Sequence, residues 1–138
     1  MLLVDTSAWI EIFRRPSRIA FEDVIDDTDR VVTCLPILQE VLQGFDDERA
    51  FRIAQTSMHA LPCVESPLSR DVIDLAVDIY RRARRAGLTV RSSVDCLVAA
   101  CASRQRLTIV HCDRDYAQLA RVIALEQIDI TPRLRRSR

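Results

Sequence analysis

The chain has 138 residues, of which 49% are hydrophobic and 29% charged, and this balance fits one folded domain and excludes a disordered body. Its 20 basic and 20 acidic residues cancel, so no global charge attracts it to nucleic acid or to anionic lipid. All basic residues are arginines, which excludes the lysine-dependent chemistries: Schiff bases, Walker-type phosphate binding and Ser–Lys dyads.

Short apolar runs predict buried strands, and apolar residues at helical spacing between capping residues predict helices. In chain order, the first half predicts strand 2–4, helix 8–13, helix 19–25 ending in Asp26, Asp27 and Asp29, strand 31–35, a helix from Pro36 closed by Gly44, helix 46–58 and strand 61–64. The second half predicts a helix from Ser69 to Gly87, a helix opened by Ser92 or Ser93, strand 108–111, helix 116–125 and strand 128–130.

Strands that alternate with helices are typical of the α/β class, in which helices cover both faces of a parallel sheet. We therefore expect a single α/β domain over residues 1–132, with a central parallel sheet of four to five strands flanked by helices. Residues 133–138 hold four arginines and are expected to form a basic C-terminal tail, either solvated or in contact with phosphates.

Cysteine usage and hydropathy predict where the protein works. The five cysteines are odd in number, contain no C-x-x-C motif and lie mostly in apolar stretches. The N-terminus has no basic region before its short apolar run, and no run of 18 apolar residues follows. We expect a cytoplasmic protein that is neither secreted nor inserted in a membrane.

Five acidic residues fall where an open parallel sheet binds its ligands, at the carboxyl ends of its strands. Asp5 follows the first strand, Asp113 and Asp115 follow the strand ending at His111, Asp95 opens a helix, and Glu40 is embedded among apolar residues of another helix. Each has a purely structural alternative, as a helix cap, a turn residue or a solvated carboxylate. Together they indicate one acidic cluster.

Clustered carboxylates must bind a proton or a cation, because two of them about 4 Å apart repel by roughly 4 kcal/mol at an effective dielectric of about 20. Ligands that are all oxygen favour Mg²⁺ or Mn²⁺. One such ion leaves four carboxylates at a formal charge of −2 and two ions bring them to zero, so one or two metals are both electrostatically reasonable. Such a metal can activate water for attack on phosphorus, so a phosphodiester is the expected substrate.

Four motifs in this order resemble those of the PIN-domain ribonucleases, and specifically the VapC toxins of type II toxin–antitoxin pairs. The motifs are Leu-Val-Asp-Thr-Ser-Ala-Trp near the start, Glu40 on a helix begun by Pro36, Val-Arg-Ser-Ser-Val-Asp-Cys-Leu-Val-Ala-Ala from Val90, and His-Cys-Asp-Arg-Asp-Tyr from His111. The resemblance implies a Mg²⁺-dependent endoribonuclease that acts on cellular RNA (tRNA or rRNA). It also implies a homodimer that is neutralised by a VapB antitoxin, whose C-terminal segment covers the active site.

Carried over by position, the resemblance assigns catalytic and metal-binding roles to Asp5, Glu40, Asp95 and Asp113, with Asp115 as an additional metal ligand. Substrate contacts fall to Thr6, Ser7 and Arg91, which match hydroxyls and a basic residue beside the site. The chain departs from many relatives at Val94, where they carry Asn.

Other interpretations stay open. A catalytically inactive PIN-like module that binds RNA or protein is the main alternative, and a phosphoacceptor domain is disfavoured because it needs a lysine. The spacing of His and Cys residues matches no zinc site. Trp9 is expected in the core or at an interface, and His111 is either a base or a packed residue. The arginines from Arg81 to Arg91 either complement a helix end or contact RNA.

Overall fold

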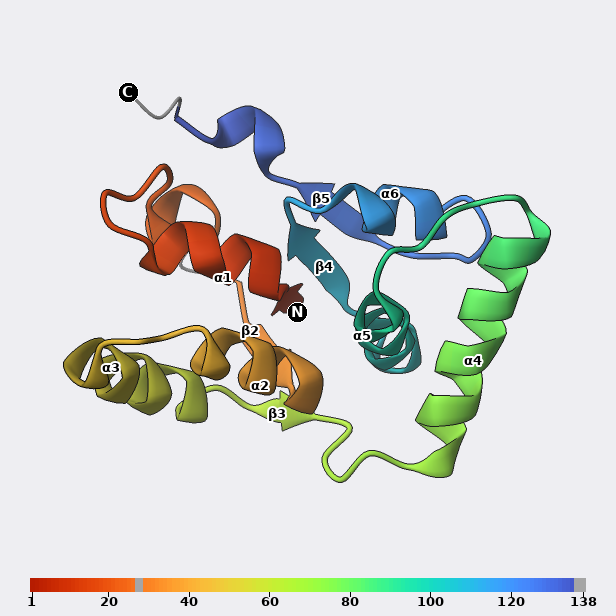
Figure 1. Cartoon of the computed structure of the whole chain (residues 1–138), viewed down its shortest axis with the longest axis horizontal. Coiled ribbons are helices and arrows are strands. Elements are labelled where there is room, and N and C mark those ends of the chain that lie inside the picture. Colours follow the sequence, from red (N-terminus) through yellow and green to blue (C-terminus); the bar gives the residue numbers. More distant parts are fainter. Residues whose placement is uncertain (27–28, 136–138) are drawn as a thin grey trace.

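The computed structural model describes residues 1–26 and 29–135 (Figure 1). Its helices are α1 (Thr6–Phe13), α2 (Leu35–Gln43), α3 (Glu48–His59), α4 (Arg70–Arg85), α5 (Ser93–Gln105) and α6 (Arg114–Leu119), with short 3₁₀ turns η1 (Phe21–Asp23) and η2 (Thr131–Arg133). Its strands are β1 (Leu2–Val4), β2 (Val31–Cys34), β3 (Cys63–Val64), β4 (Thr108–His111) and β5 (Gln127–Asp129). The predicted α/β class and the parallel sheet flanked by helices are confirmed.

The five strands form a parallel sheet in the order β3-β2-β1-β4-β5. The chain runs outward from β1 through β2 to β3, and then returns to the other side of β1 to build β4 and β5. The strand order therefore reverses between β1 and β4, and the carboxyl ends of two such strands border the crevice in which open α/β sheets bind ligands. Asp5 and Asp113 lie at this edge, just after β1 and β4.

Helix starts follow the local signals in the sequence. The carboxylate of Asp5 caps α1, the hydroxyl of Ser69 caps α4, and the hydroxyl of Ser92 caps α5. Each side-chain oxygen accepts a hydrogen bond from a backbone N–H of the first turn, which satisfies a donor that the helix itself leaves without a partner. In Figure 1, α4 and α5 lie side by side at one end of the molecule, opposite α3.

Two predicted helices differ from the structure. The segment predicted as helix 19–25 forms only η1, although Ile19 and Ile25 are buried as expected. A helix so short is marginal in water, and its acidic end would lie unfavourably at the helix C-terminus. The predicted helix 116–125 starts earlier and ends at Leu119, because Asp113 caps it and the chain must return to the sheet as β5. Asp27, one of the three acids predicted to end helix 19–25, lies outside the described residues.

The division between a domain at 1–132 and a tail at 133–138 stays a prediction. Leu134 packs against the hydrophobic core, and the backbone N–H of Arg135 donates to the carbonyl of Arg18 at 2.8 Å. The last three residues lie outside the part of the chain that is described. Within the described residues, no helix has the length and the apolar character needed to cross a membrane.

Candidate metal centre

Three carboxylates converge at the edge of the sheet. Asp95 in the first turn of α5, Asp113 as the N-cap of α6 and Asp115 in its first turn each place one oxygen within 4.8 Å of the other two. The backbone N–H of Asp115 donates to Asp113 Oδ1 at 2.9 Å, which fixes these two acids relative to each other. Asp95 and Asp115 are buried, so their charges are poorly screened by water.

Asp5 joins this cluster through a tyrosine. Its Oδ2 accepts hydrogen bonds from the backbone N–H of Ser7 at 3.0 Å and from the Ser7 hydroxyl at 2.6 Å. Its Oδ1 accepts a hydrogen bond from the Tyr116 hydroxyl at 2.7 Å, and the same hydroxyl lies 3.4 Å from Asp95 Oδ1. Tyr116 is fully buried, and it ties the end of β1 to α5 and α6.

Glu40 lies on α2 and reaches the first turn of α1, next to Asp5. The Thr6 hydroxyl donates to Glu40 Oε1 at 3.0 Å, which links the glutamate to the first turn of α1. Burial raises the pKa of Glu40, the hydrogen bond from Thr6 lowers it, and the nearby charges of Asp5 and Asp113 raise it further. Of the five acids predicted from the sequence, three therefore form the close cluster, Asp5 is connected to it through Tyr116, and Glu40 lies near enough for the charges of Asp5 and Asp113 to raise its pKa.

Asp95 carries the clearest electrostatic signature of the site. Burial first, and then the charges of Asp113, Asp5 and Asp115, raise its pKa to about 8. Its Oδ2 is buried and has no hydrogen-bond partner among the described residues. A buried carboxylate oxygen without a donor is costly, and a cation bound to that oxygen removes the cost. The residues thus fit a divalent cation held by oxygen ligands.

Arg91 partly offsets the negative charge. Its Nε lies 3.5 Å from Asp115 Oδ1, its Nη2 lies 3.5 Å from Asp113 Oδ1, and its backbone N–H donates to Asp115 Oδ2 at 3.3 Å. The Arg91 side chain is 54% exposed, so part of the guanidinium faces solvent. One cation beside five acids leaves the cluster negative when all five are ionised, which favours binding of a proton or of a further cation.

Two further residues hold the ends of the strands in place. The Ser7 hydroxyl, besides donating to Asp5, accepts a hydrogen bond from the backbone N–H of Cys112 at 3.1 Å. His111 is fully buried; its Nδ1 accepts from the backbone N–H of Asp113 at 3.1 Å, and its Nε2 lies 2.5 Å from Gln127 Oε1. Both ring nitrogens are engaged, which favours the prediction that His111 is a packed residue, and its contact with the backbone N–H positions Asp113.

Tyr116 and Gln127 were not among the residues expected at the site. Tyr116 is the last residue of the His-Cys-Asp-Arg-Asp-Tyr motif, where the sequence predicted only the start of a helix. Its place three residues after Asp113, on the same side of a helix, was the available signal. Trp9, expected in the core or at an interface, is buried and stacks on Phe13 and Phe21.

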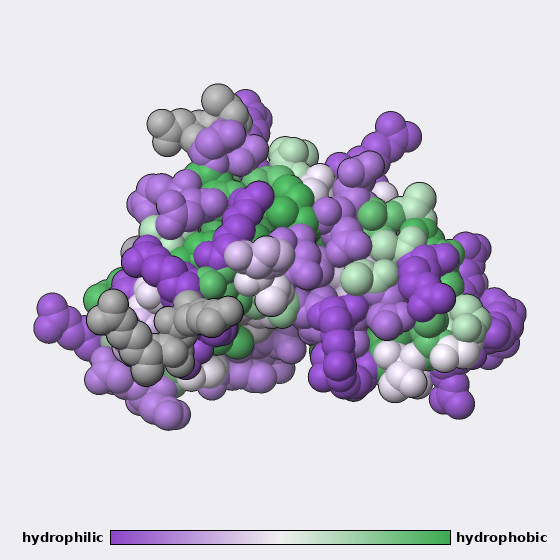
Figure 2. Space-filling model, turned by 90° about the horizontal axis from the view of Figure 1, so that it is seen from above, coloured by the Kyte–Doolittle hydropathy of each residue, from purple (hydrophilic) through white to green (hydrophobic). Residues whose placement is uncertain are grey.

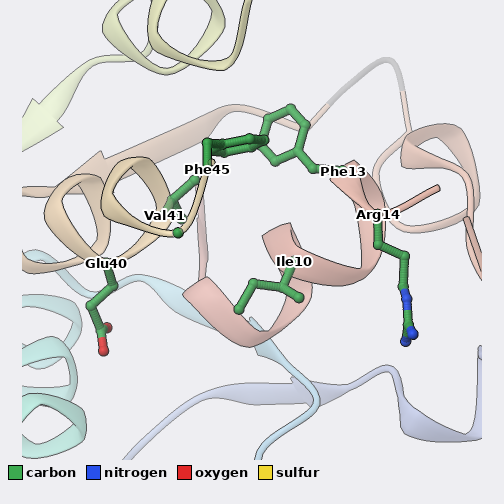
Figure 3. A pocket seen from close by; sticks show the side chains of 7 residues that line it. Ile10, Phe13, Arg14, Glu40, Val41 and Phe45 are labelled. Atoms are coloured by element: carbon green, nitrogen blue, oxygen red, sulfur yellow. The ribbon is translucent and has the colours of Figure 1, made fainter. Parts of the chain in front are cut away.

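An apolar groove with a volume of about 260 Å³ begins beside Glu40 and runs between α1 and α2. Figure 3 shows Glu40 at one end and Arg14 at the other, with Ile10 between them and the rings of Phe13 and Phe45 side by side along one wall. Ile10 is 55% exposed, although it is a large apolar residue. The groove therefore presents an apolar surface that leads to the acidic cluster.

Fold and site together define a small α/β domain with an acidic crevice at the switch point of its sheet, and comparison with known proteins gives the family. A model of the PIN domain matches residues 2–122, and the chain belongs to this family. Ribonuclease VapC11 of Mycobacterium tuberculosis and a VapC ribonuclease of Mycobacterium bovis are each 41% identical over 132 residues, covering 91% of this chain and 96% of theirs.

Solved structures show the same fold. VapBC-5 from Mycobacterium tuberculosis, a member of the VapBC family of toxin–antitoxin systems, aligns with a TM-score of 0.67 and 26% identity, covering 92% of this chain and 96% of that one. DNA-bound VapBC from Salmonella typhimurium aligns with a TM-score of 0.74 and 17% identity over 93% and 96% of the two chains. The predicted membership of the PIN-domain family is confirmed.

Proposed function

We propose that this chain is a metal-dependent endoribonuclease, the toxin of a type II toxin–antitoxin pair, which cleaves cellular tRNA or rRNA and so inhibits translation and growth. The observation that carries the proposal is the acidic cluster at the switch point of the sheet, with its unpartnered Asp95 oxygen. The curated relatives at 41% identity, which are named as VapC ribonucleases, support the same activity.

We assign metal binding to Asp5, Glu40, Asp95, Asp113 and Asp115, for one or two ions of Mg²⁺ or Mn²⁺. When bound there, such a cation supplies Lewis-acid stabilisation of the charge that develops on the phosphate oxygens. The chain itself supplies the positions of the carboxylates. Ser7 and Tyr116 fix Asp5 from two sides, and the N-cap geometry of α6 fixes Asp113 against Asp115.

Glu40 is the residue that we assign to proton transfer. Thr6 holds its Oε1, and its Oε2 has no hydrogen-bond donor among the residues that the structure describes. Its pKa is raised chiefly by burial, which brings the group closer to the working pH of a general base. We propose that Oε2 accepts the proton of the attacking water, and that the exposed part of Arg91 contacts the phosphate, with Thr6 and Ser7 lining the same crevice.

Asp95→Asn tests the catalytic proposal. The variant keeps the size of the side chain but removes a carboxylate, so we expect loss of RNA cleavage and loss of the Mn²⁺ binding heat seen by isothermal titration calorimetry. Asp71→Asn is the matched control, because Asp71 is an exposed acid in the first turn of α4, and it should keep both. Cleavage retained in a folded, purified Asp95→Asn protein would contradict the proposal. Absence of both Mn²⁺ binding and RNA cleavage in the folded wild type would favour the inactive, PIN-like binding module.

We further propose that a VapB antitoxin binds in the groove between α1 and α2. Structural neighbours are VapBC complexes, including VapBC-5 from Mycobacterium tuberculosis. An apolar segment of the antitoxin would cover Ile10, Phe13 and Phe45, and its continuation would reach Glu40 and close access to the acids. A groove that is apolar along its length and acidic at one end suits an apolar segment followed by a basic residue.

The homodimer stays a prediction, and the surface between α4 and α5 supports it. A groove with a volume of about 300 Å³ lies there, and Ile73 and Val77 on its rim are 43% and 53% exposed. Burial of such residues against a second copy would remove apolar surface from water. Val77→Glu should convert a dimer to a monomer in sedimentation experiments, whereas Ile53→Glu on α3 should not. An unchanged sedimentation coefficient for Val77→Glu would place the dimer contact elsewhere.

A further inference from the structure

A second, polar cavity adjoins the acidic cluster. It has a volume of about 360 Å³ and lies between the loop that follows α4 and the outer face of α6. Arg91 and Thr89 line it from the loop, and Arg114, Gln118 and Arg121 line it from α6 and the turn after it. Asp115 also borders the cavity, so this space begins where the metal centre ends.

The charges in this cavity do not balance. Arg91 is paired with Asp113 and Asp115. Within residues 1–26 and 29–135, Arg114 has neither an ion pair nor a hydrogen bond, and Arg121 donates only to the neutral amide of Gln118, at 3.3 Å. Two guanidinium groups therefore stand in the cavity without an acid to neutralise them.

The spacing on α6 explains why these side chains meet. Arg114 and Gln118 are four residues apart and lie on the same side of the helix, and Arg121 continues that side in the following turn. Asp115 and Tyr116 of the same helix point inward and are buried. One short helix thus presents acids and a tyrosine to the metal centre and arginines to the adjoining cavity.

The loop opposite α6 leaves the cavity open. It starts at Gly87, whose φ of 76° lies in the left-handed region that favours glycine, so that the chain turns sharply after α4. Figure 2 shows the molecule from above, with hydrophilic residues at its right-hand edge beside apolar ones, and Arg114 and Arg121, which line the cavity, are exposed. An anion can therefore approach from solvent.

We propose that this cavity binds a non-scissile backbone phosphate of the RNA substrate, next to the phosphate held at the metal centre. The inference rests on the proposed ribonuclease function and assigns Arg114 and Arg121 to substrate binding. Guanidinium groups bind phosphate oxygens with two parallel hydrogen bonds, and the Gln118 amide adds a donor between them. A chain of phosphates at regular spacing can occupy both sites at once, which aligns the scissile bond with the acids.

The test is RNA binding by the double variant Arg114→Gln/Arg121→Gln. The probe is a fluorescein-labelled, single-stranded oligoribonucleotide of 12 nucleotides, and anisotropy is measured in EDTA so that no cleavage occurs. We expect affinity to fall roughly tenfold at low salt, and the slope of log Kd against log salt to fall by about 0.7, as for one lost phosphate contact on a single strand. A thermal melt checks that the variant is folded.

Arg49→Gln is the matched control, since Arg49 is an exposed arginine on α3, at the opposite end of the molecule, and it has no ion pair among the described residues. It should bind the oligonucleotide like the wild type. Wild-type RNA affinity and salt slope in a folded double variant would overturn the inference. It would also be overturned if the double variant lost affinity for the antitoxin but not for the RNA. Cleavage by Asp95→Asn would instead contradict the proposed metal centre, and the binding experiment would still report on the cavity.

Discussion

The Tyr116 hydroxyl donates a hydrogen bond to Asp5 Oδ1 at 2.7 Å, across 111 positions of sequence. This one contact joins the end of the first strand to the last helix, and the tyrosine ring packs in the core against His111, with centroids 5.0 Å apart. The acidic cluster is thus attached to the core by a side chain that is itself uncharged. Burial and the charges of Asp5 and Asp95 raise the pKa of Tyr116 well above its usual value. The hydroxyl therefore keeps its proton and can donate a hydrogen bond to Asp5.

Tyr116→Phe removes this donor and leaves the ring in place. Because the hydrogen bond is made to a buried carboxylate, we expect a loss of about 1.5–3 kcal/mol in the free energy of unfolding, measured by urea denaturation in EDTA. Tyr80→Phe is the control, since the Tyr80 hydroxyl only accepts a 3.5 Å contact from Arg84 at the surface. Equal stability losses in the two variants would contradict the role of Tyr116.

Asp95→Asn has a predicted pH signature in the metal-free protein. The pKa of Asp95 is about 8 when folded and about 3.9 in an unfolded chain, so unfolding releases a proton between these values. Stability of the wild type should therefore fall as the pH rises from about 4 to about 8 and then level off. In thermal melts with EDTA, Asp95→Asn should be more stable than the wild type at pH 8, and this advantage should shrink toward pH 4.

Asp71→Asn should show no such pH trend, because Asp71 is an exposed residue in the first turn of α4 and does not belong to the acidic cluster. Excess Mg²⁺ should stabilise the wild type and leave Asp95→Asn unchanged, since a ligand stabilises only the state that binds it. A pH-independent difference between wild type and Asp95→Asn would show that the cluster does not strain the metal-free fold.

The ion pair between Glu11 and Arg18 should contribute to the free energy of unfolding. Glu11 is buried on α1, and its pKa is lowered chiefly by the hydrogen bond from Arg18, against the effect of burial. Arg18→Gln leaves the buried Glu11 carboxylate with only the longer contact to Arg14 Nη1 at 3.6 Å, so we expect a loss of about 1–3 kcal/mol at pH 7. Arg52→Gln breaks the exposed pair with Glu48 and should cost less than about 0.5 kcal/mol.

The pH dependence of this pair has the opposite sign to that of Asp95. A carboxyl whose folded pKa is lowered stabilises the protein above its ordinary pKa of about 4.3, and this stability is lost as the pH falls through the folded pKa. The stability difference between the wild type and Glu11→Gln should therefore be largest near neutral pH and disappear on acidification. A difference that persists at pH 2 would show that packing, and not charge, holds Glu11.

Ile10→Glu tests the groove between α1 and α2. Ile10 is 55% exposed, so a charge there should change the free energy of unfolding by no more than about 0.5 kcal/mol. It should nevertheless weaken binding of a coexpressed VapB-type antitoxin, measured by calorimetry, because the groove loses its apolar character. Ile53→Glu, at a residue 59% exposed on α3, is the control and should bind the antitoxin like the wild type. Equal antitoxin affinity in both variants would place the interface elsewhere.

The sequence alone predicted the alternation of strands and helices, apart from helix 19–25, a helix start at Ser92 or Ser93, and the candidate acids, because these depend on neighbouring residues and on periodicity. Only the tertiary structure decided that Asp115 joins Asp95 and Asp113 within 4.8 Å, that Tyr116 ties Asp5 to the core, and that Arg114 and Arg121 share a cavity. The contacts of Asp95 with α6 and of Tyr116 with Asp5 link residues that are distant in the chain, and they form only when the strand order reverses between β1 and β4 and brings several helix starts to one edge of the sheet. Arg114 and Arg121 are close in sequence, but the cavity they line is completed by the loop after α4.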